Sequence, residues 1–462
     1  MALLGLWWIR PQPDHEDFIV CEWNDDQEKT MKQNSVSGIR PLVYLGIVAL
    51  MLGLGYRWLR SPPGSPPAPA STASTLPPPA QQATAHEDAE PREVPLAKFI
   101  SDTRPPAVIP ATSRAVSTAQ PAVARVEPSP YTRQLVSSLT NLDFSHGPIT
   151  REQAQQWKEG LQTLTQQGVT ALPAIREFLE RNQDLNLAAL SGGGQLGQSS
   201  VRAALIDALQ QIGGPEATAL MLQTLQTTAM PSEIALLARN LEQQAPGQYR
   251  QETLNAVTEV LAMAEKGQLA GWDVGALFQV LQNHGDATTA EALAQLQSKW
   301  NYYATMALAG LPWGEGVPSL IRQVQDATAG AGAKGALAFQ MLAQMAAEYP
   351  DAGAALIEQA RRNQISDSAW RKIATGLAGD QYQIGMPPEL GGLTSPLPGL
   401  KTYHIESGNQ NFYSLPLNAN LPSDQISQRL ALIDQLLAAA SSPAAVEALQ
   451  NARALLGKTP NN

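Results

Sequence analysis

The sequence predicts an all-α fold for the chain beyond about residue 131, in the form of an irregular α-solenoid of stacked helix pairs. Helix formers such as Ala, Leu, Gln and Glu dominate this part, whereas β-branched and aromatic residues are sparse. Turns marked by glycine or aspartate recur about every 37 residues, which is close to the length of helical-pair repeats. A non-repetitive helical bundle is the alternative that this pattern leaves open.

The clearest helix pair lies at 201–226. Apolar residues fall on one face of its first helix at helical spacing, and polar residues take the other face. Gly213 and Gly214 end that helix, and Pro215 is well placed in the first turn of the next one. The residues that carry the pattern are Val201, Arg202, Ala203, Ala204, Leu205, Ala208, Leu209, Ile212, Gly213, Leu222 and Leu225.

These residues resemble the HEAT repeat, in particular the short bacterial kind found in phycobilisome-lyase-type HEAT proteins. The resemblance covers about Val201–Gln226. It implies stacked helix pairs, and it implies no lyase chemistry, since most proteins with such repeats are not lyases. A weaker echo joins 168–175 to 316–321, because a glycine and a nearby proline start an apolar helix face in both segments.

An apolar segment at residues 41–59 predicts a transmembrane signal-anchor. Its uncharged core from Pro41 to Tyr56 falls just below the usual spanning length of about 17–25 residues. Arg57 can reach the headgroups, and the two residues that follow it lengthen the apolar stretch. A cleaved signal peptide is the alternative, although no small-residue cleavage site follows closely.

Residues 1–40 are expected to form a cytoplasmic tail. Slightly more positive charge precedes the apolar segment than follows it, which favours an N-terminus in the cytoplasm. The residues from Met31 onward resemble the n-region of a signal-anchor, so the true start is either Met31 or Met1. Both starts predict a single-pass protein of a bacterial inner membrane with its C-terminal domain in the periplasm.

Residues 61–130 predict a disordered linker rich in Pro, Ala and Ser. Its apolar residues are too few and too scattered to offset the chain entropy that folding would cost. Runs such as Pro77 to Pro79 favour extended polyproline II, in which the linker would span roughly 200 Å. Either reach through a cell-wall layer or a spacer of no particular length explains such a segment.

The chain beyond the linker divides into three predicted parts. Residues 131–382 carry HEAT-like helical repeats, residues 383–422 are an irregular loop region rich in Pro and Gly, and residues 423–462 are a C-terminal helical cap. Within them we expect a small β-hairpin near 402–415 and two capping helices at about 423–440 and 443–456.

Charge and cysteine content exclude some classes of partner and site. The formal charge is −10 and no Lys/Arg cluster is present, so the sequence predicts no nucleic-acid partner. The same balance argues against docking on anionic lipid. The single cysteine, Cys21, lies upstream of the apolar segment. The predicted helical domain therefore has neither an internal disulfide nor a cysteine-based metal site.

No catalytic constellation stands out, so the sequence predicts no enzyme, no metal and no cofactor. The five histidines lack a second His or Cys at metal-ligand spacing. The segment Ser191–Gly197 imitates a phosphate cradle but lacks the Lys-Ser/Thr ending of a P-loop, which favours an inter-helix loop. The alternative is an enzyme acting on an envelope polymer near 383–422. Its candidate residues are Glu389, Tyr403, His404 and Glu406.

Two aromatic groups are the candidates for contact with a partner. Large amphipathic rings favour recognition surfaces, although packing between repeats and cross-strand packing in the hairpin also explain them. The candidate partner-binding residues are Trp300, Tyr303, Trp313, Tyr403, Phe412 and Tyr413.

These patterns together predict a membrane-anchored scaffold that mediates protein–protein interaction in the cell envelope. Stacked helix pairs offer a long surface, and a membrane tether raises the local concentration near envelope partners. The identity of the partner does not follow from the sequence. The two alternatives are the envelope-polymer enzyme and a purely structural tether.

Overall fold

The computed structural model describes residues 92–94, 126–141, 147–326, 333–385, 399–416 and 421–458. These residues belong to one compact unit, Ala85–Asn462. The predicted tail at 1–40 and the predicted membrane segment at 41–59 lie outside them. No helix among the described residues has both the length and the apolar character needed to cross a bilayer.

The described residues are mainly helical, as the composition predicts. The first helices are α3 (Pro130–Thr140), α4 (Arg151–Gln166), α5 (Leu172–Glu180), α6 (Val201–Ile212), α7 (Gly214–Thr227), α8 (Pro231–Gln244), α9 (Arg250–Glu265) and α10 (Gly275–His284). The later helices are α11 (Ala287–Gly310), α12 (Val317–Asp326), α13 (Ala333–Met345), α14 (Pro350–Arg361), α15 (Asp367–Leu377), α16 (Ser423–Ala439) and α17 (Pro443–Gly457). Short 3₁₀ turns lie at η3 (Gly168–Ala171), η4 (Gly193–Leu196) and η5 (Pro312–Gly314).

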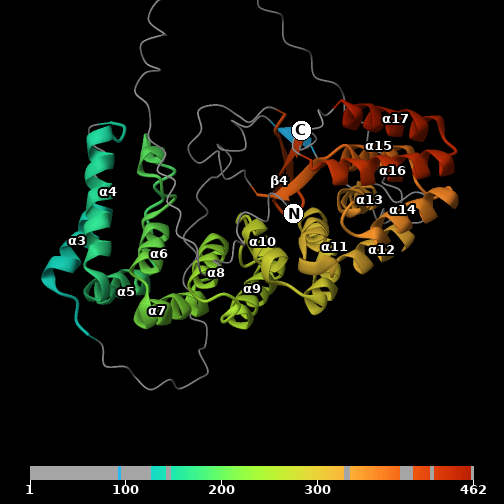
Figure 1. Cartoon of the computed structure of the whole chain (residues 1–462). Coiled ribbons are helices and arrows are strands. Elements are labelled where there is room, and N and C mark those ends of the chain that lie inside the picture. Colours follow the sequence, from blue (N-terminus) through green and yellow to red (C-terminus); the bar gives the residue numbers. More distant parts are fainter. Residues whose placement is uncertain are drawn as a thin grey trace, which may run out of the picture. The chain divides into compact units, whose positions relative to one another are not determined.

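The helices pack in rows, because most of them contact both the next helix and the next but one. One row runs through α4, α6, α8 and α10, and beside it run α3, α5, α7 and α9 (Figure 1). Beyond α10 the rows continue as α11, α13, α15 and α17 and as α12, α14 and α16. The apolar faces of these helices join in one continuous buried core.

The pair α6–α7 shows how the sequence sets these helices. Ser200 caps α6 by accepting a hydrogen bond from the backbone N–H of Ala203 at 3.1 Å. Gly213 ends α6 at a φ of 66°, a left-handed angle that suits glycine, and Pro215 lies in the first turn of α7. The predicted helix pair at 201–226 is therefore confirmed, and the two helices expected at about 423–440 and 443–456 are present as α16 and α17.

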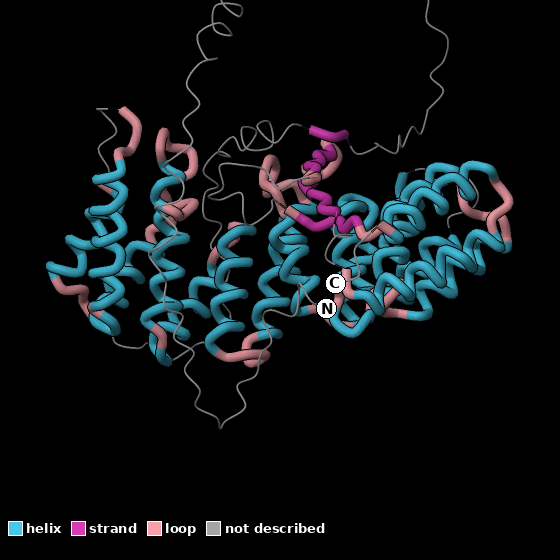
Figure 2. Tube along the Cα trace, turned by 45° about the horizontal axis from the view of Figure 1, so that its top comes forward, coloured by secondary structure: helices cyan, strands magenta, loops and turns pink. Residues whose placement is uncertain are grey.

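A four-stranded antiparallel sheet lies against the helices, so the fold is mainly helical with one small sheet. Its order is β1-β3-β4-β2, with β2 at Asp380–Ile384, β3 at Lys401–Ile405 and β4 at Gln410–Pro416. Figure 2 shows these strands in magenta over the middle of the helical rows, where β2 contacts α10, α11 and α15. The hairpin predicted near 402–415 is confirmed as β3–β4.

The remaining strand, β1 (Arg92–Val94), corrects one prediction. It lies within the segment 61–130 that the sequence predicts as disordered throughout, and it pairs with the open edge of β3. Arg92 lies opposite His404, and Val94 lies opposite Thr402. The backbone groups of an edge strand bind any extended segment that reaches them, so three residues without apolar periodicity form a strand there.

Candidate protein-interaction site

Five of the six predicted partner-binding residues lie in the core, which corrects their assignment as surface contacts. They are Trp300, Tyr303, Tyr403, Phe412 and Tyr413. Their side chains are all buried, and an aromatic side chain without an exposed face cannot contact a partner. Packing between helices or across the hairpin, the alternative that the sequence leaves open, therefore explains these five residues.

Trp300 and Tyr303 both pack on Phe278 of α10. The ring centroid of Phe278 lies 5.9 Å from that of Trp300, in an edge-to-face arrangement, and 5.5 Å from that of Tyr303. Trp300 also marks a kink inside α11, where its backbone leaves helical angles with φ of −124° and ψ of 57°. The aromatic group at 300–303 therefore joins α10 to α11.

Tyr303 also fastens the hairpin to the helices. Its hydroxyl donates to Asp273 Oδ1 at 2.7 Å and accepts from the backbone N–H of Asn411. Asn411 Nδ2 in turn donates to Asp273 Oδ2 at 2.9 Å, and Gln410 Oε1 accepts from the Tyr303 backbone N–H at 3.0 Å. Burial, followed by the charge of Asp273, raises the pKa of Tyr303 well above its usual value, so the hydroxyl stays protonated.

Replacing Tyr303 by Phe is expected to lower the free energy of unfolding by about 1–3 kcal/mol, because it leaves buried hydrogen-bonding groups unsatisfied. The ring and its packing on Phe278 remain, so the loss reports the hydroxyl alone. Urea unfolding of the full chain measures it. An unchanged midpoint and slope would show that the hydroxyl does not fasten the hairpin.

The hairpin aromatics form a second packed group around Phe412. Its ring stacks on Tyr403 at 5.0 Å and on Tyr302 at 5.3 Å, measured between centroids. The Tyr413 hydroxyl donates to Gln383 Oε1. The hairpin is therefore held to α11 and to β2 by its rings.

Two of the described candidates for the alternative enzyme site, Tyr403 and His404, do not converge. Tyr403 and His404 are neighbours in β3, so their side chains point to opposite faces of the sheet. His404 Nδ1 is engaged by Asn411 Oδ1 at 2.7 Å, and Glu406 is exposed in the hairpin turn. Glu389 lies outside the described residues.

Trp313, the sixth predicted residue, differs from the other five. Its side chain is 86% exposed, the highest value among the exposed large hydrophobic residues that the structure describes. Its backbone lies in the left-handed region with a φ of 59°, an angle that a bulky residue rarely adopts. Exposure and backbone strain thus coincide at one residue of η5, in the turn between α11 and α12.

Three closely packed glycines, Gly310, Gly314 and Gly316, hold this turn in place. A Cβ atom at Gly316 would overlap the backbone carbonyl of Leu308, and one at Gly314 would overlap the ring of Tyr349. Gly310 lies equally close to the side chain of Gln282. The backbone of the turn is therefore pressed against α10, α11 and the start of α14, while the indole ring of Trp313 stays in solvent.

Replacing Trp313 by Asn is expected to leave the free energy of unfolding unchanged or to raise it by up to about 1 kcal/mol. The exposed ring contributes little burial, and Asn adopts the left-handed region at lower cost than Trp. Differential scanning calorimetry measures the change. A loss of more than about 1 kcal/mol would mean that the ring is part of the fold.

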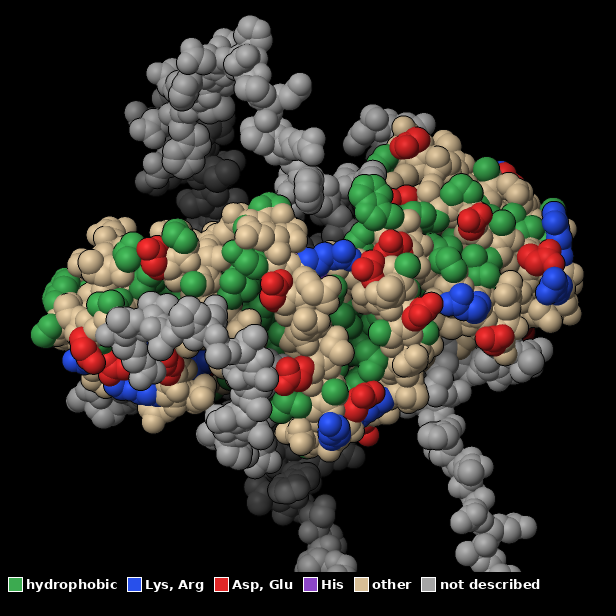
Figure 3. Space-filling view, turned by 90° about the horizontal axis from the view of Figure 1, so that it is seen from below, with side chains coloured by type: hydrophobic (Ala, Val, Ile, Leu, Met, Phe, Trp, Pro, Cys, Tyr) green, Lys and Arg blue, Asp and Glu red, His purple; other side chains and the backbone are tan. Residues whose placement is uncertain are grey.

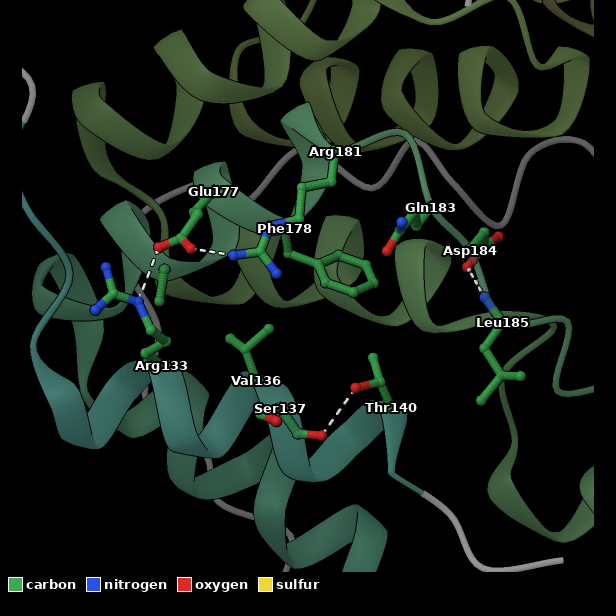
Figure 4. Close-up of a pocket in the computed structure, with 11 residues that line it drawn as sticks. Arg133, Val136, Ser137, Thr140, Glu177, Phe178, Arg181, Gln183, Asp184 and Leu185 are labelled. Carbon is green, nitrogen blue, oxygen red and sulfur yellow. Dashed lines mark hydrogen bonds and ion pairs between the residues drawn. The ribbon is translucent and has the colours of Figure 1, made fainter. Parts of the chain in front are cut away.

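A cavity of about 370 Å³ lies between α3 and α5 (Figure 4), and sequence reasoning missed it. Val136 and Phe178 form part of its apolar wall, while Glu177 joins two arginines at its rim. Glu177 accepts from Arg133 Nε at 3.0 Å and pairs with Arg181. Burial raises the pKa of Glu177, but its bonds and charges from both arginines outweigh this and lower it overall. The Arg133–Glu177 pair arises only from the tertiary contact of α3 with α5, so no sequence motif marks it.

The glycine-rich loop Ser191–Gly197 has a structural explanation. A Cβ at Gly193 would overlap the Leu187 carbonyl oxygen, and one at Gly192 would press on the Ile149 backbone. These glycines therefore permit close backbone packing. In the described part of the chain, no three His, Cys, Asp or Glu side chains are grouped so that they could hold a metal ion.

Charged side chains are mixed on the surface. On the face drawn in Figure 3, Lys and Arg of the described residues are scattered among Asp and Glu rather than gathered into a stripe.

Comparisons of the chain with protein-family models, with curated proteins and with solved structures found no match.

Proposed function

We propose that this chain is a helical-repeat scaffold that binds a protein partner through Trp313. The observation that carries the proposal is the contrast among the aromatic residues: five are core, whereas Trp313 stands in solvent on a strained backbone. Binding energy at protein interfaces concentrates in a few residues, among which Trp is enriched. Strain kept at an exposed residue that does not stabilise the fold is typical of a functional position.

The packing of the helices supports a solenoid of HEAT-like pairs as the scaffold. Most helices contact the next helix and the next but one. Such contacts extend the rows helix by helix, as in a solenoid, instead of closing a bundle. The pair α6–α7, which carries the HEAT resemblance, takes a regular place in these rows.

The proposed setting is the cell envelope. The apolar segment at 41–59 would anchor the chain as a single-pass protein, and the proline-rich linker would hold the helical domain away from the bilayer. Export of that domain to a periplasm follows from the charge bias around the segment. Tethering would raise the effective concentration of the scaffold near its partner.

The test compares full-length tagged chains purified from the membranes of the cell that makes them. The Trp313→Ala variant should lose a co-purifying protein by at least about ten-fold at an unchanged melting temperature, as expected for a hot-spot residue. Val169→Ala is the matched control, because Val169 is a large hydrophobic residue that is 56% exposed and lies far from η5 in sequence. Equal recovery from all three chains would reject Trp313 as the contact.

A further inference from the structure

The face of Trp313 is available to a cation. Indole is the best side-chain ring for a cation–π contact. Elsewhere this chain makes such contacts internally, with Lys299 Nζ 4.7 Å from the Trp300 ring centroid and Lys372 Nζ 5.4 Å from that of Tyr382. Within the described part of the chain no Lys or Arg lies over Trp313.

The surroundings of Trp313 carry negative charge. Glu315 follows it by two residues and is half-buried in the same turn. Tyr349 packs against Gly314, and the exposed Glu348, whose charge acts on the Tyr349 hydroxyl, brings a second carboxylate near this turn. Burial raises the pKa of the Tyr349 hydroxyl, and the charge of Glu348 and a hydrogen bond with it raise it further.

No basic side chain in the same two segments offsets these carboxylates. The stretch 311–321 contains Glu315 and no Lys or Arg, and the stretch 346–356 contains Glu348 and Asp351 and no Lys or Arg. The next arginine, Arg322 in α12, donates to Ser319 Oγ at 2.8 Å. An exposed indole therefore stands beside two carboxylates whose own chain segments carry no basic residue.

We infer that the Trp313 turn recognises a basic segment of a partner protein, in which a Lys or Arg lies over the indole ring and its neighbours pair with Glu315 and Glu348. This inference rests on the proposed function and adds the chemistry of the partner. Charge complementarity carries it: the turn is acidic and aromatic, and a chain of net charge −10 repels acidic partners.

Fluorescence anisotropy with two labelled peptides of equal length tests the inference on the full chain in detergent. One peptide alternates Arg with Ser, and the other carries Gln in place of each Arg. The full chain should bind the Arg peptide at least about ten-fold more tightly than the Gln peptide, and Trp313→Ala should remove about ten-fold of that affinity. Added salt should weaken the binding, because the carboxylates are exposed or half-buried.

Matched variants separate this site from general acidity. Replacing both Glu315 and Glu348 by Gln should weaken binding of the Arg peptide several-fold, whereas the same change at Glu252 and Glu447, which are exposed acidic residues of α9 and α17, should not. Three results would each overturn the inference: no binding of the Arg peptide, equal affinity for both peptides, or equal losses from the two double variants.

A further experiment distinguishes failure of this inference from failure of the proposed function. The Glu315→Gln/Glu348→Gln variant is also carried through the membrane co-purification. A partner that is lost on Trp313→Ala but retained on this double change would leave the proposed function standing and reject a basic partner. Retention of the partner on Trp313→Ala would reject both.

Discussion

Replacing Arg202 by Ala is expected to lower the free energy of unfolding by about 3–5 kcal/mol. Arg202 and Glu233 form an ion pair whose side chains are each only 4% exposed, with Arg202 Nη2 donating to Glu233 Oε2 at 3.0 Å. Arg202 Nη1 also donates to the Leu179 carbonyl at 2.7 Å, and Thr228 Oγ1 donates to Glu233 Oε2 at 2.7 Å. The pair thus joins α5, α6 and α8, and its loss leaves a buried carboxylate without its cation.

The control for this prediction separates the penalty of an unpaired charge from the value of the pair. The double change Arg202→Met and Glu233→Met removes both charges and should recover much of the loss, since apolar residues of similar volume often replace buried ion pairs at little cost. Arg362→Ala removes an exposed partner of Glu358 and should cost less than about 0.5 kcal/mol. A loss below about 1 kcal/mol in Arg202→Ala would contradict the buried pair.

Replacing Arg429 by Ala is expected to cost about 3–4 kcal/mol, because buried carbonyls would lose a charged donor. The Arg429 guanidinium donates to the Gly376 carbonyl at 2.8 Å and to the Gln344 carbonyl at 3.2 Å, at the ends of α15 and α13. A cation is favourable at the C-terminal end of a helix. Burial lowers the pKa of Arg429 to about 10, so the group remains charged at neutral pH.

Two further variants test whether the loss depends on the buried guanidinium of Arg429. Arg453 pairs with Asp434 near the same end of the chain, but both side chains are more than half exposed, so Arg453→Ala should change stability by less than about 0.5 kcal/mol. Arg429→Lys keeps the charge and reaches fewer carbonyls, so it should lose an intermediate amount. Guanidinium unfolding followed by circular dichroism measures all three. Equal losses from Arg429→Ala and Arg453→Ala would contradict the capping of two helix ends.

Local signals in the sequence predict much of the secondary structure. Gly213 and Pro215 locate the turn between α6 and α7, because a left-handed angle and a missing N–H act within a few residues. The hairpin follows from two short runs around Ser407, Gly408 and Asn409, and the structure places β3 and β4 on either side of them. Such features depend on neighbours in the chain, so one sequence is enough to find them.

The candidate site depends on contacts between distant residues, which the sequence does not display. Trp300 and Trp313 lie 13 residues apart and look alike as candidates, yet one packs on Phe278 and the other is exposed. The difference arises where Tyr349 and Leu308 press on the glycines of the turn. The sequence does not predict the strand β1 for the same reason, because the edge of β3, far along the chain, supplies its partner.

Site-specific photo-crosslinking at position 313 tests whether the Trp313 turn contacts a protein partner. A benzoylphenylalanine is introduced in place of Trp313, and separately in place of Val169, in the full chain in its native membrane. We expect a covalent adduct with a protein at position 313 and not at position 169, with the helical circular dichroism of both chains unchanged. No adduct at 313, or the same adducts at both positions, would contradict a scaffold that binds its partner through this turn.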